Sequence, residues 1–130
     1  MYIKKISLCV KNNERGSKLE HQMRLYSEYF NSIKKGKKQV EVRLNDEKRR
    51  KINVGDTIVF IKVPEQNETI KVQVTELRKY DTFKDMYTDI PFKDFDCEGW
   101  SMEEMVNGTY EIYTPEQERE WGTLAITIKY

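Results

Sequence analysis

A lysine, a glutamate and an arginine lie close together in the first half of the chain, as Lys38, Glu41 and Arg43. If this stretch is an extended strand, alternation places Glu41 and Arg43 on one face and Val40 and Val42 on the other. Arg43 can bind a phosphate or carboxylate through two parallel hydrogen bonds. Lys38 can act as a point charge or, when desolvated, as a base or nucleophile, and Glu41 can transfer a proton or hold the lysine. The three residues therefore predict a shallow cleft for a polar ligand.

The same pattern has a second interpretation. Alternating Lys, Glu and Arg side chains also occur on the solvated outer face of a strand, where each ion pair contributes about 0–1 kcal/mol. The residue types alone leave both interpretations open, and the burial of the three side chains separates them.

A dense basic cluster follows this stretch, at Lys48, Arg49, Arg50 and Lys51. Its side chains could contact phosphates, and each contact would add salt-sensitive affinity. Two acidic residues come just before the cluster. A solvated turn of mixed charge is therefore the alternative.

Aromatic residues are frequent after the central strands, and such residues can stack on nucleobases. Packing against the sheet is the alternative for each of them. Trp100 is the strongest candidate for a binding role because it lies beside a turn glycine and near Glu98. The group consists of Tyr80, Phe83, Tyr87, Phe92, Phe95 and Trp100.

A helix and a strand must position the charged residues. Apolar side chains at helical spacing predict an amphipathic helix before them, at Tyr26, Tyr29, Phe30 and Ile33. Gly36 suits the left-handed position that follows a helix, and Lys38 lies where the helix gives way to a strand. The alternation from Val40 to Leu44 predicts a strand with an apolar core face and a charged outer face.

The remaining elements follow from similar patterns. Further strands are predicted at Tyr2–Val10, His21–Leu25, Thr57–Val63, Ile70–Val74 and Thr123–Tyr130. Short helices are predicted at Glu47–Lys51, at Thr82–Tyr87, and after capping boxes that begin at Ser101 and Thr114. Most strands alternate as one-sided antiparallel strands do. The sequence therefore predicts an α+β fold, a small curved β-barrel of five or six mostly antiparallel strands with short peripheral helices.

Length and composition narrow the class of protein. The 130 residues suit a single domain spanning 1–130, and the net charge of +1 means that any affinity for polyanions must come from local clustering. The two cysteines and the single histidine lack the spacing of a zinc site or disulfide framework, so no metal or cofactor is expected. No apolar run approaches the roughly 20 residues that span a bilayer, and the N-terminus lacks an apolar leader. A cytoplasmic protein without membrane contact is expected.

Two single residues are of types that often act in catalysis, but their surroundings in the sequence argue against that role here. His21 is the only histidine, and a lone histidine on a strand is expected to be structural. Cys97 lies among Asp94, Asp96 and Glu98, whose negative charge should raise the pKa of its thiol. Neither residue is expected to act as a catalytic group.

The charged stretch resembles the signature of the ASCH domain family, G-x-K-x-x-E-x-R, which is carried here by Gly36, Lys38, Glu41 and Arg43. The flanks are similar to that family as well. They comprise the aromatic helix before the signature, Asn45–Arg50 after it, the turn Val54-Gly55-Asp56 and the segment Thr75–Phe83. The resemblance is close over roughly residues 20–83 and looser towards the C-terminus.

This resemblance implies a PUA-like β-barrel with a cleft over the signature strand, and an association with RNA binding, RNA modification, coregulator functions or, in some members, hydrolysis. One bacterial branch removes the acetyl group from N4-acetylcytidine with a lysine, a threonine and a glutamate. Its lysine falls on Lys38, and its glutamate can be laid on Glu98. Its threonine position holds Glu41 here, so the hydroxyl group is missing from that place.

The expected function is binding of RNA, a nucleotide or a nucleoside, in RNA metabolism or its regulation. The candidate ligand-binding residues are Lys38, Glu41, Arg43, Lys48, Arg49, Arg50, Tyr80 and Trp100. The alternative is a hydrolase acting on a modified nucleoside or on RNA, with Lys38, Glu41 and Glu98 as catalytic groups. A protein-interaction domain is a further alternative.

Overall fold

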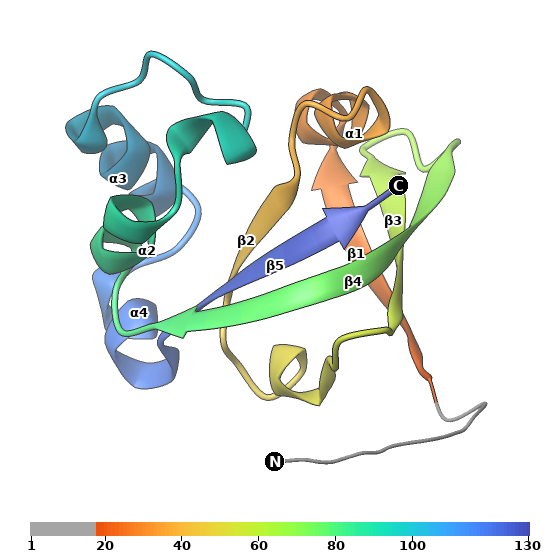
Figure 1. Ribbon diagram of the computed structural model, residues 1–130, viewed down its shortest axis with the longest axis horizontal. Coiled ribbons are helices and arrows are strands. Elements are labelled where there is room, and N and C mark those ends of the chain that lie inside the picture. The colour runs from red at the N-terminus through yellow and green to blue at the C-terminus, as the bar shows by residue number, and fades with distance from the viewer. Residues whose placement is uncertain (1–17) are drawn as a thin grey trace.

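The computed structural model describes residues 18–130 and contains a five-stranded sheet in the order β1-β3-β4-β5-β2 (Figure 1). The predicted strand at Tyr2–Val10 lies outside the described residues. Three neighbouring pairs are antiparallel, whereas β1 runs parallel to β3. The strands are β1 Glu20–Tyr26, β2 Val40–Leu44, β3 Thr57–Val63, β4 Thr69–Tyr80 and β5 Thr123–Lys129.

The sheet curls into a half-barrel, so its two edge strands face each other across an open seam (Figure 1). The Arg43 side chain crosses this seam between β2 and β1. The guanidinium of Arg43 donates a hydrogen bond from Nη2 to the backbone oxygen of Arg24, at 2.8 Å. The α+β class and the curved, PUA-like arrangement of mostly antiparallel strands are confirmed.

Helix α1 (Ser27–Lys34) follows β1 directly and covers one end of the half-barrel (Figure 1). Its buried face consists of Phe30 and Ile33, two of the four predicted positions. Tyr26 instead ends β1, and both Tyr26 and Tyr29 are exposed. Gly36 has a φ of +78°, a left-handed backbone conformation that residues other than glycine adopt only at a cost in free energy. The chain therefore turns sharply after α1 and delivers Lys38 to the start of β2.

Three further helices gather on one side of the sheet, and we call residues 81–122 the helical unit (Figure 1). It contains α2 (Phe83–Asp89), α3 (Met102–Tyr110) and α4 (Pro115–Trp121), and a short 3-10 turn, η2 (Phe92–Asp94). Both predicted capping boxes are present, because the Ser101 and Thr114 side chains each accept from a backbone N–H three residues later. Local sequence thus fixes where α3 and α4 begin.

Two apolar clusters hold these layers together. One fills the inside of the half-barrel and includes Phe30, Phe60 and Ile126. The other lies between the sheet and the helical unit, where Val40 and Phe83 are buried. Val40 therefore packs towards the helices, and the alternate residues of β2 point towards the seam.

Two elements differ from the sequence-based expectation. β4 continues from Val74 to Tyr80, through an irregularity in its pairing with β5 between Val74 and Glu76. Such a bulge shifts the alternation by one residue, which hides the second half of the strand from a pattern search. The predicted helix at Glu47–Lys51 is a single 3-10 turn, η1 (Arg49–Lys51), and Asp46 accepts a hydrogen bond from the Arg49 N–H.

The helical unit depends on a buried carboxylate. Glu118 is 5% exposed, and it accepts from the Phe83 N–H at 2.7 Å and from the Tyr110 hydroxyl at 2.6 Å. Replacing Glu118 with Ala leaves these donors unpaired, so we expect a loss of about 2–3 kcal/mol in the free energy of unfolding. Urea unfolding measures this loss. The matched control is Glu120→Ala on the exposed side of α4, for which a change of comparable size would contradict the assignment.

Candidate functional site

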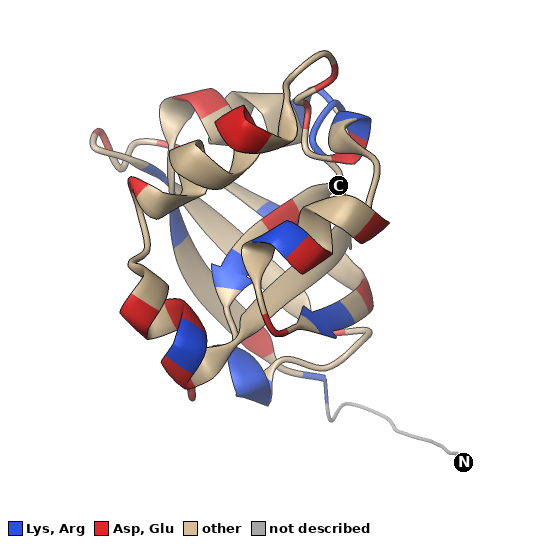
Figure 2. Cartoon of the chain, turned by 90° about the vertical axis from the view of Figure 1, so that its left-hand side faces the viewer, with Lys and Arg blue, Asp and Glu red and all other residues tan. Residues whose placement is uncertain are grey.

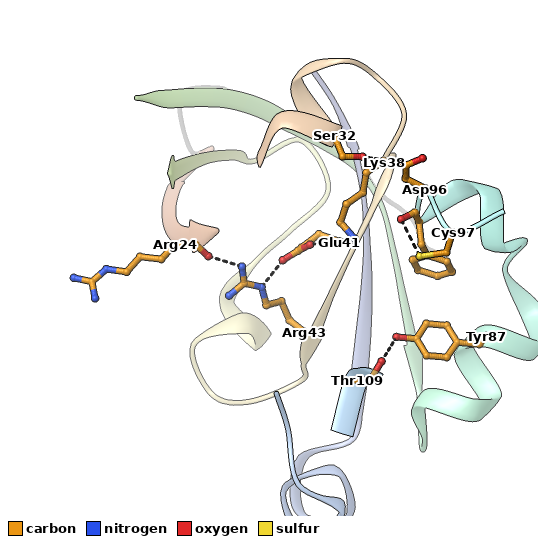
Figure 3. Close-up of polar contacts among 10 residues, drawn as sticks. Arg24, Ser32, Lys38, Glu41, Arg43, Tyr87, Asp96, Cys97 and Thr109 are labelled. Atoms are coloured by element: carbon orange, nitrogen blue, oxygen red, sulfur yellow. Dashed lines mark hydrogen bonds and ion pairs between the residues drawn. The ribbon is translucent and has the colours of Figure 1, made fainter. Parts of the chain in front are cut away.

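Glu41 connects the three charged residues of the signature stretch (Figure 3). Its Oε2 accepts from the Arg43 Nε at 2.7 Å, and its Oε1 lies 3.5 Å from the Lys38 Nζ. Glu41 is 4% exposed and Lys38 is 7% exposed. The charged face of β2 is therefore buried at the seam, and the expectation of a charged outer face, like the alternative of a solvated surface, is wrong here.

The pairing sets the charge state of Glu41. Burial pushes the pKa of its carboxyl upwards, but the neighbouring Arg43 and Lys38 outweigh that effect and hold the pKa below its ordinary value of 4.5. The pKa of Arg43, which burial alone would lower, is raised by Glu41. At neutral pH the site therefore contains a carboxylate held between two cations.

Lys38 reaches this position because both neighbouring layers hold its backbone. Its N–H donates to the Ser32 oxygen of α1 at 3.2 Å, and Lys38 forms a bridge with Phe95 of the helical unit. The next N–H, of Gln39, donates to the Asp94 oxygen at 2.8 Å. The lysine is thus fixed between the half-barrel and the helices.

The ammonium of Lys38 retains donors for a ligand. It lies 5.6 Å from the ring centroid of Tyr29 and 5.9 Å from that of Phe95, so its cation–π contacts are with two ring faces. The contact with Glu41 is its one ion pair among residues 18–130. Because a lysine ammonium carries three N–H donors, this buried group has hydrogen-bonding capacity to spare.

These groups lie in a cavity of about 570 Å³ between the half-barrel and the helical unit. Its buried part contains Lys38 and Glu41, with Tyr87 and Phe95 against them. Exposed residues surround the opening, which we call the mouth: Arg24, Tyr26, Tyr29, Trp100, Glu104, Asn107, Glu111 and Ile112. The cavity therefore has a charged floor, formed by Lys38 and Glu41, and walls that include aromatic side chains.

Two tyrosines extend the polar lining. The Tyr87 hydroxyl lies 2.6 Å from the Thr109 hydroxyl, and burial raises the pKa of Tyr87 to about 12. Tyr113 stacks on Phe83 with ring centroids 5.7 Å apart, and burial raises its pKa although Arg43 lowers it. Both phenols therefore stay protonated at neutral pH and can donate hydrogen bonds.

Of the eight candidate ligand-binding residues, Lys38, Glu41, Arg43 and Trp100 line the cavity, as do Tyr87 and Phe95 of the predicted aromatic group. Glu98 is exposed and does not line it, so the glutamate suggested by the N4-acetylcytidine branch is not supplied from there. Tyr80 donates to Asp89 at 2.5 Å and packs beside the helices. Tyr80 is therefore also outside the cavity lining.

The basic cluster lies outside the lining as well. Arg50 donates to the backbone oxygen of Asn45 at 2.7 Å and covers the Trp121 ring at 5.4 Å. Arg49 pairs with Asp46 at 3.5 Å, while Lys48 is exposed. Of the three cluster residues that were candidates for ligand binding, Arg49 and Arg50 thus tie η1 to its surroundings.

Several lining residues escaped the sequence analysis, among them Arg24, Tyr29, Thr109, Glu111 and Tyr113. Tyr29 was interpreted only as part of an apolar helix face, although it is 38% exposed. The others come from segments that no motif connects to the signature. Thr109, Glu111 and Tyr113 come close to the signature stretch only in the folded chain, because the turn after α3 returns the chain towards β2.

The pKa of the Cys97 thiol is raised as expected, but burial is the main cause, and Asp96 is the one predicted acidic neighbour that contributes. Burial raises the pKa of the Cys97 thiol, Lys38 lowers it, and Asp96 raises it further, which keeps the thiol protonated at neutral pH. His21 lies 2.8 Å from the Asp56 carboxylate, which also accepts from the Asn53 N–H. Within residues 18–130, no group of three or more His, Cys, Asp or Glu could hold a metal ion.

The arrangement permits two kinds of chemistry. The carboxylate and ammonium can hold a neutral polar edge by accepting and donating hydrogen bonds side by side. Lys38 and Glu41 can also exchange protons with a bound molecule, since both are removed from bulk water.

Among residues 18–130, no helix is both long and apolar enough to cross a membrane.

The family model for the ASCH domain matches residues 23–130. This chain belongs to the ASCH domain family. The PUA-like fold of that family is associated with RNA binding and RNA metabolism. No curated protein matches the chain.

Solved structures agree with this assignment. The crystal structure of hypothetical protein PH0355 is 37% identical and has a TM-score of 0.75, covering 85% of this chain and 97% of that one. The solution structure of protein PF0455 from Pyrococcus furiosus is 35% identical, with a TM-score of 0.68 and coverage of 85% and 96%. ASCH from Zymomonas mobilis, at 13% identity, a TM-score of 0.60 and coverage of 85% and 67%, shows a likeness in fold alone.

The buried pair makes the stability of this ASCH domain depend on pH. The folded-state pKa of Glu41 lies below 4.5, so its contribution is present above that pH and is lost as the pH falls through the folded value. We expect Glu41→Gln to destabilise the protein by about 2–3 kcal/mol at neutral pH, because Arg43 then lacks a buried counterion. Urea unfolding at a series of pH values should show this difference shrinking in acid. A difference independent of pH would contradict the assigned pairing.

Proposed function

We propose that the cavity binds one nucleoside or nucleotide unit at a time, with the nucleobase against Lys38 and Glu41. The observation that carries this proposal is a buried ammonium beside a buried carboxylate, both with hydrogen-bonding capacity left over. The two groups already pair with each other, and the ammonium donors and carboxylate lone pairs left over remain available in the cavity. A ligand with a donor and an acceptor side by side can use both.

Nucleobases match this requirement. The edge of cytosine or adenine presents an amino donor next to a ring nitrogen acceptor, and carboxylates are known partners of the cytosine amino group. Glu41 can accept from such an amino group, while Lys38 donates to the neighbouring nitrogen or oxygen. The adjacent position of these two side chains, 3.5 Å apart, suits a flat edge of this type.

The walls of the cavity suit a flat aromatic ligand. Tyr29 and Trp100 stand at the mouth, and Phe95 lies deeper. Stacking of a base on an aromatic side chain contributes about 1–3 kcal/mol. A volume of about 570 Å³ lies within the range of about 300–1,000 Å³ that small-molecule sites occupy.

Titration with a panel of ribonucleosides and modified ribonucleosides tests the proposal. We expect at least one member to bind, and Glu41→Gln to weaken that binding about tenfold or more, because a hydrogen bond to a charged group contributes about 1.5–3 kcal/mol. Calorimetric titration below the melting temperature of each variant provides the measurement.

The matched control is Lys48→Met, which removes a charge from the exposed basic cluster outside the cavity. Its affinity for the nucleoside should equal that of the wild type. The proposal fails if no member of the panel binds, or if Lys48→Met and Glu41→Gln weaken binding equally.

Hydrolysis of the bound ligand is the second candidate function. The observation in its favour is the pairing of Lys38 with Glu41 in a site removed from solvent, where an amine and a carboxylate can transfer protons. Glu98 is exposed and lies outside the cavity lining. Its position weighs against the deacetylation mechanism of the bacterial branch, in which the corresponding glutamate would have to reach the bound N4-acetylcytidine.

Incubation with N4-acetylcytidine separates binding from hydrolysis. If the site hydrolyses the amide, the wild type releases cytidine and acetate, and Lys38→Met reduces the rate by at least about a hundredfold, as loss of an acid–base group does. Methionine keeps the length and the ring contacts of Lys38 while removing its charge. Chromatography of the products measures the rate, and equal background release by both proteins excludes this activity.

A further inference from the structure

The near-neutral net charge of this chain conceals two regions of opposite charge. The helical unit carries twelve Asp and Glu residues against three Lys and Arg residues, a net charge of −9. The other described residues, 18–80 and 123–130, carry nine acidic and sixteen basic residues, a net charge of +7. Figure 2, which looks onto the helical unit, shows acidic residues on each of its helices. The cavity lies where these two regions meet.

Acidic side chains dominate the charge at the mouth of the cavity. The charged residues of the mouth are Arg24, Glu104 and Glu111. Glu104 uses one oxygen to accept from the Ser101 N–H at 2.9 Å, and the Glu111 carboxylate makes no hydrogen bond or ion pair within the part of the chain that is described. Figure 3 shows the Arg24 side chain turned away from the Glu41–Arg43 pair. The cation of the mouth is therefore directed away from the floor.

Glu111 lies close enough to α1 to affect Tyr29 across the opening. The pKa of Tyr29 is raised first by burial and then by Glu28, and Glu111 contributes in the same direction. Tyr29 belongs to α1, whereas Glu111 follows α3 on the opposite wall. Asp96, which lies near Cys97, adds a further negative charge on the helical side.

We propose that Glu104 and Glu111, which we call the acidic lip, make this site selective for uncharged nucleosides over nucleotides that carry a phosphate. The inference rests on the proposed function, because it takes the nucleobase to lie against Lys38 and Glu41 on the floor. The sugar and any 5′-phosphate then extend towards the mouth. A phosphate monoester carries a charge of about −1.5 to −2 at pH 7 and meets the carboxylates of the lip.

The interior does not compensate for this repulsion. Arg43 is already engaged with Glu41 and with the Arg24 oxygen, and Lys38 is paired with Glu41. At low ionic strength the screening length exceeds about 10 Å, so the carboxylates of the lip can repel a phosphate in the mouth without touching it. The same charges disfavour a polynucleotide backbone at this opening.

Calorimetric titration of the wild type with a ribonucleoside and its 5′-monophosphate tests the lip. At low salt we expect the nucleoside to bind about fivefold to tenfold more tightly than the monophosphate, and the difference to shrink as salt is added. In Glu111→Gln and in the double variant Glu104→Gln/Glu111→Gln, the ratio of the two affinities should fall towards one. Glu120→Gln removes the same charge from α4 outside the lining, and it should leave the ratio unchanged.

Each outcome has a distinct meaning. If the monophosphate binds as tightly as the nucleoside or more tightly, or if the ratio is the same in Glu111→Gln as in the wild type, the lip has no selective role while the proposed function stands. If neither ligand binds, the proposed function itself fails, and the inference fails with it. A ratio that changes equally in Glu120→Gln shows a general charge effect and overturns the assignment to the lip.

Discussion

The contact between Glu41 and Arg43 is the interaction on which the rest of the site depends. It joins two side chains of one strand, and the guanidinium continues from there to the backbone of the opposite edge strand. One arginine therefore neutralises a buried carboxylate and spans the open seam of the half-barrel. Because these charges are removed from water, loss of Glu41 leaves Arg43 without its carboxylate partner, and loss of Arg43 leaves Glu41 with Lys38 alone. The signature of this family is thus a structural requirement as well as a chemical one.

The two apolar clusters explain why the cavity exists. The half-barrel has its own core, and the helical unit packs on the outside of β2 and β5 through a second one. Between these clusters lies a layer where polar side chains from β2 meet aromatic side chains from the helices. Glu118 completes the helical unit from within by holding the start of α2 and the end of α3. The opening therefore sits beside the layer in which the helical unit packs on the sheet.

Much of the fold could be predicted from the sequence because its signals are local. The capping boxes at Ser101 and Thr114, the strand Thr57–Val63 and the turn at Gly36 all follow from a few neighbouring residues. The parallel pairing of β1 with β3 and the bulge in β4 depend on contacts across the sheet and were missed. For the site, the motif indicated Lys38, Glu41 and Arg43, whereas the opposite wall comes from residues 104–113, whose place follows from tertiary packing alone. The basic cluster lies outside the cavity lining, and η1 uses two of its arginines internally.

The segment that carries Lys38 is bound to the half-barrel and to the helical unit at once. Its N–H groups donate to α1 on one side and to Asp94 on the other, and the Ser32 hydroxyl donates to Asp96 at 2.7 Å. Widening the gap between the half-barrel and the helices would break these bonds. The width of the gap is therefore set by hydrogen bonds of the fold itself. For any molecule enclosed there, the residence time is therefore a property of the scaffold as much as of its own contacts.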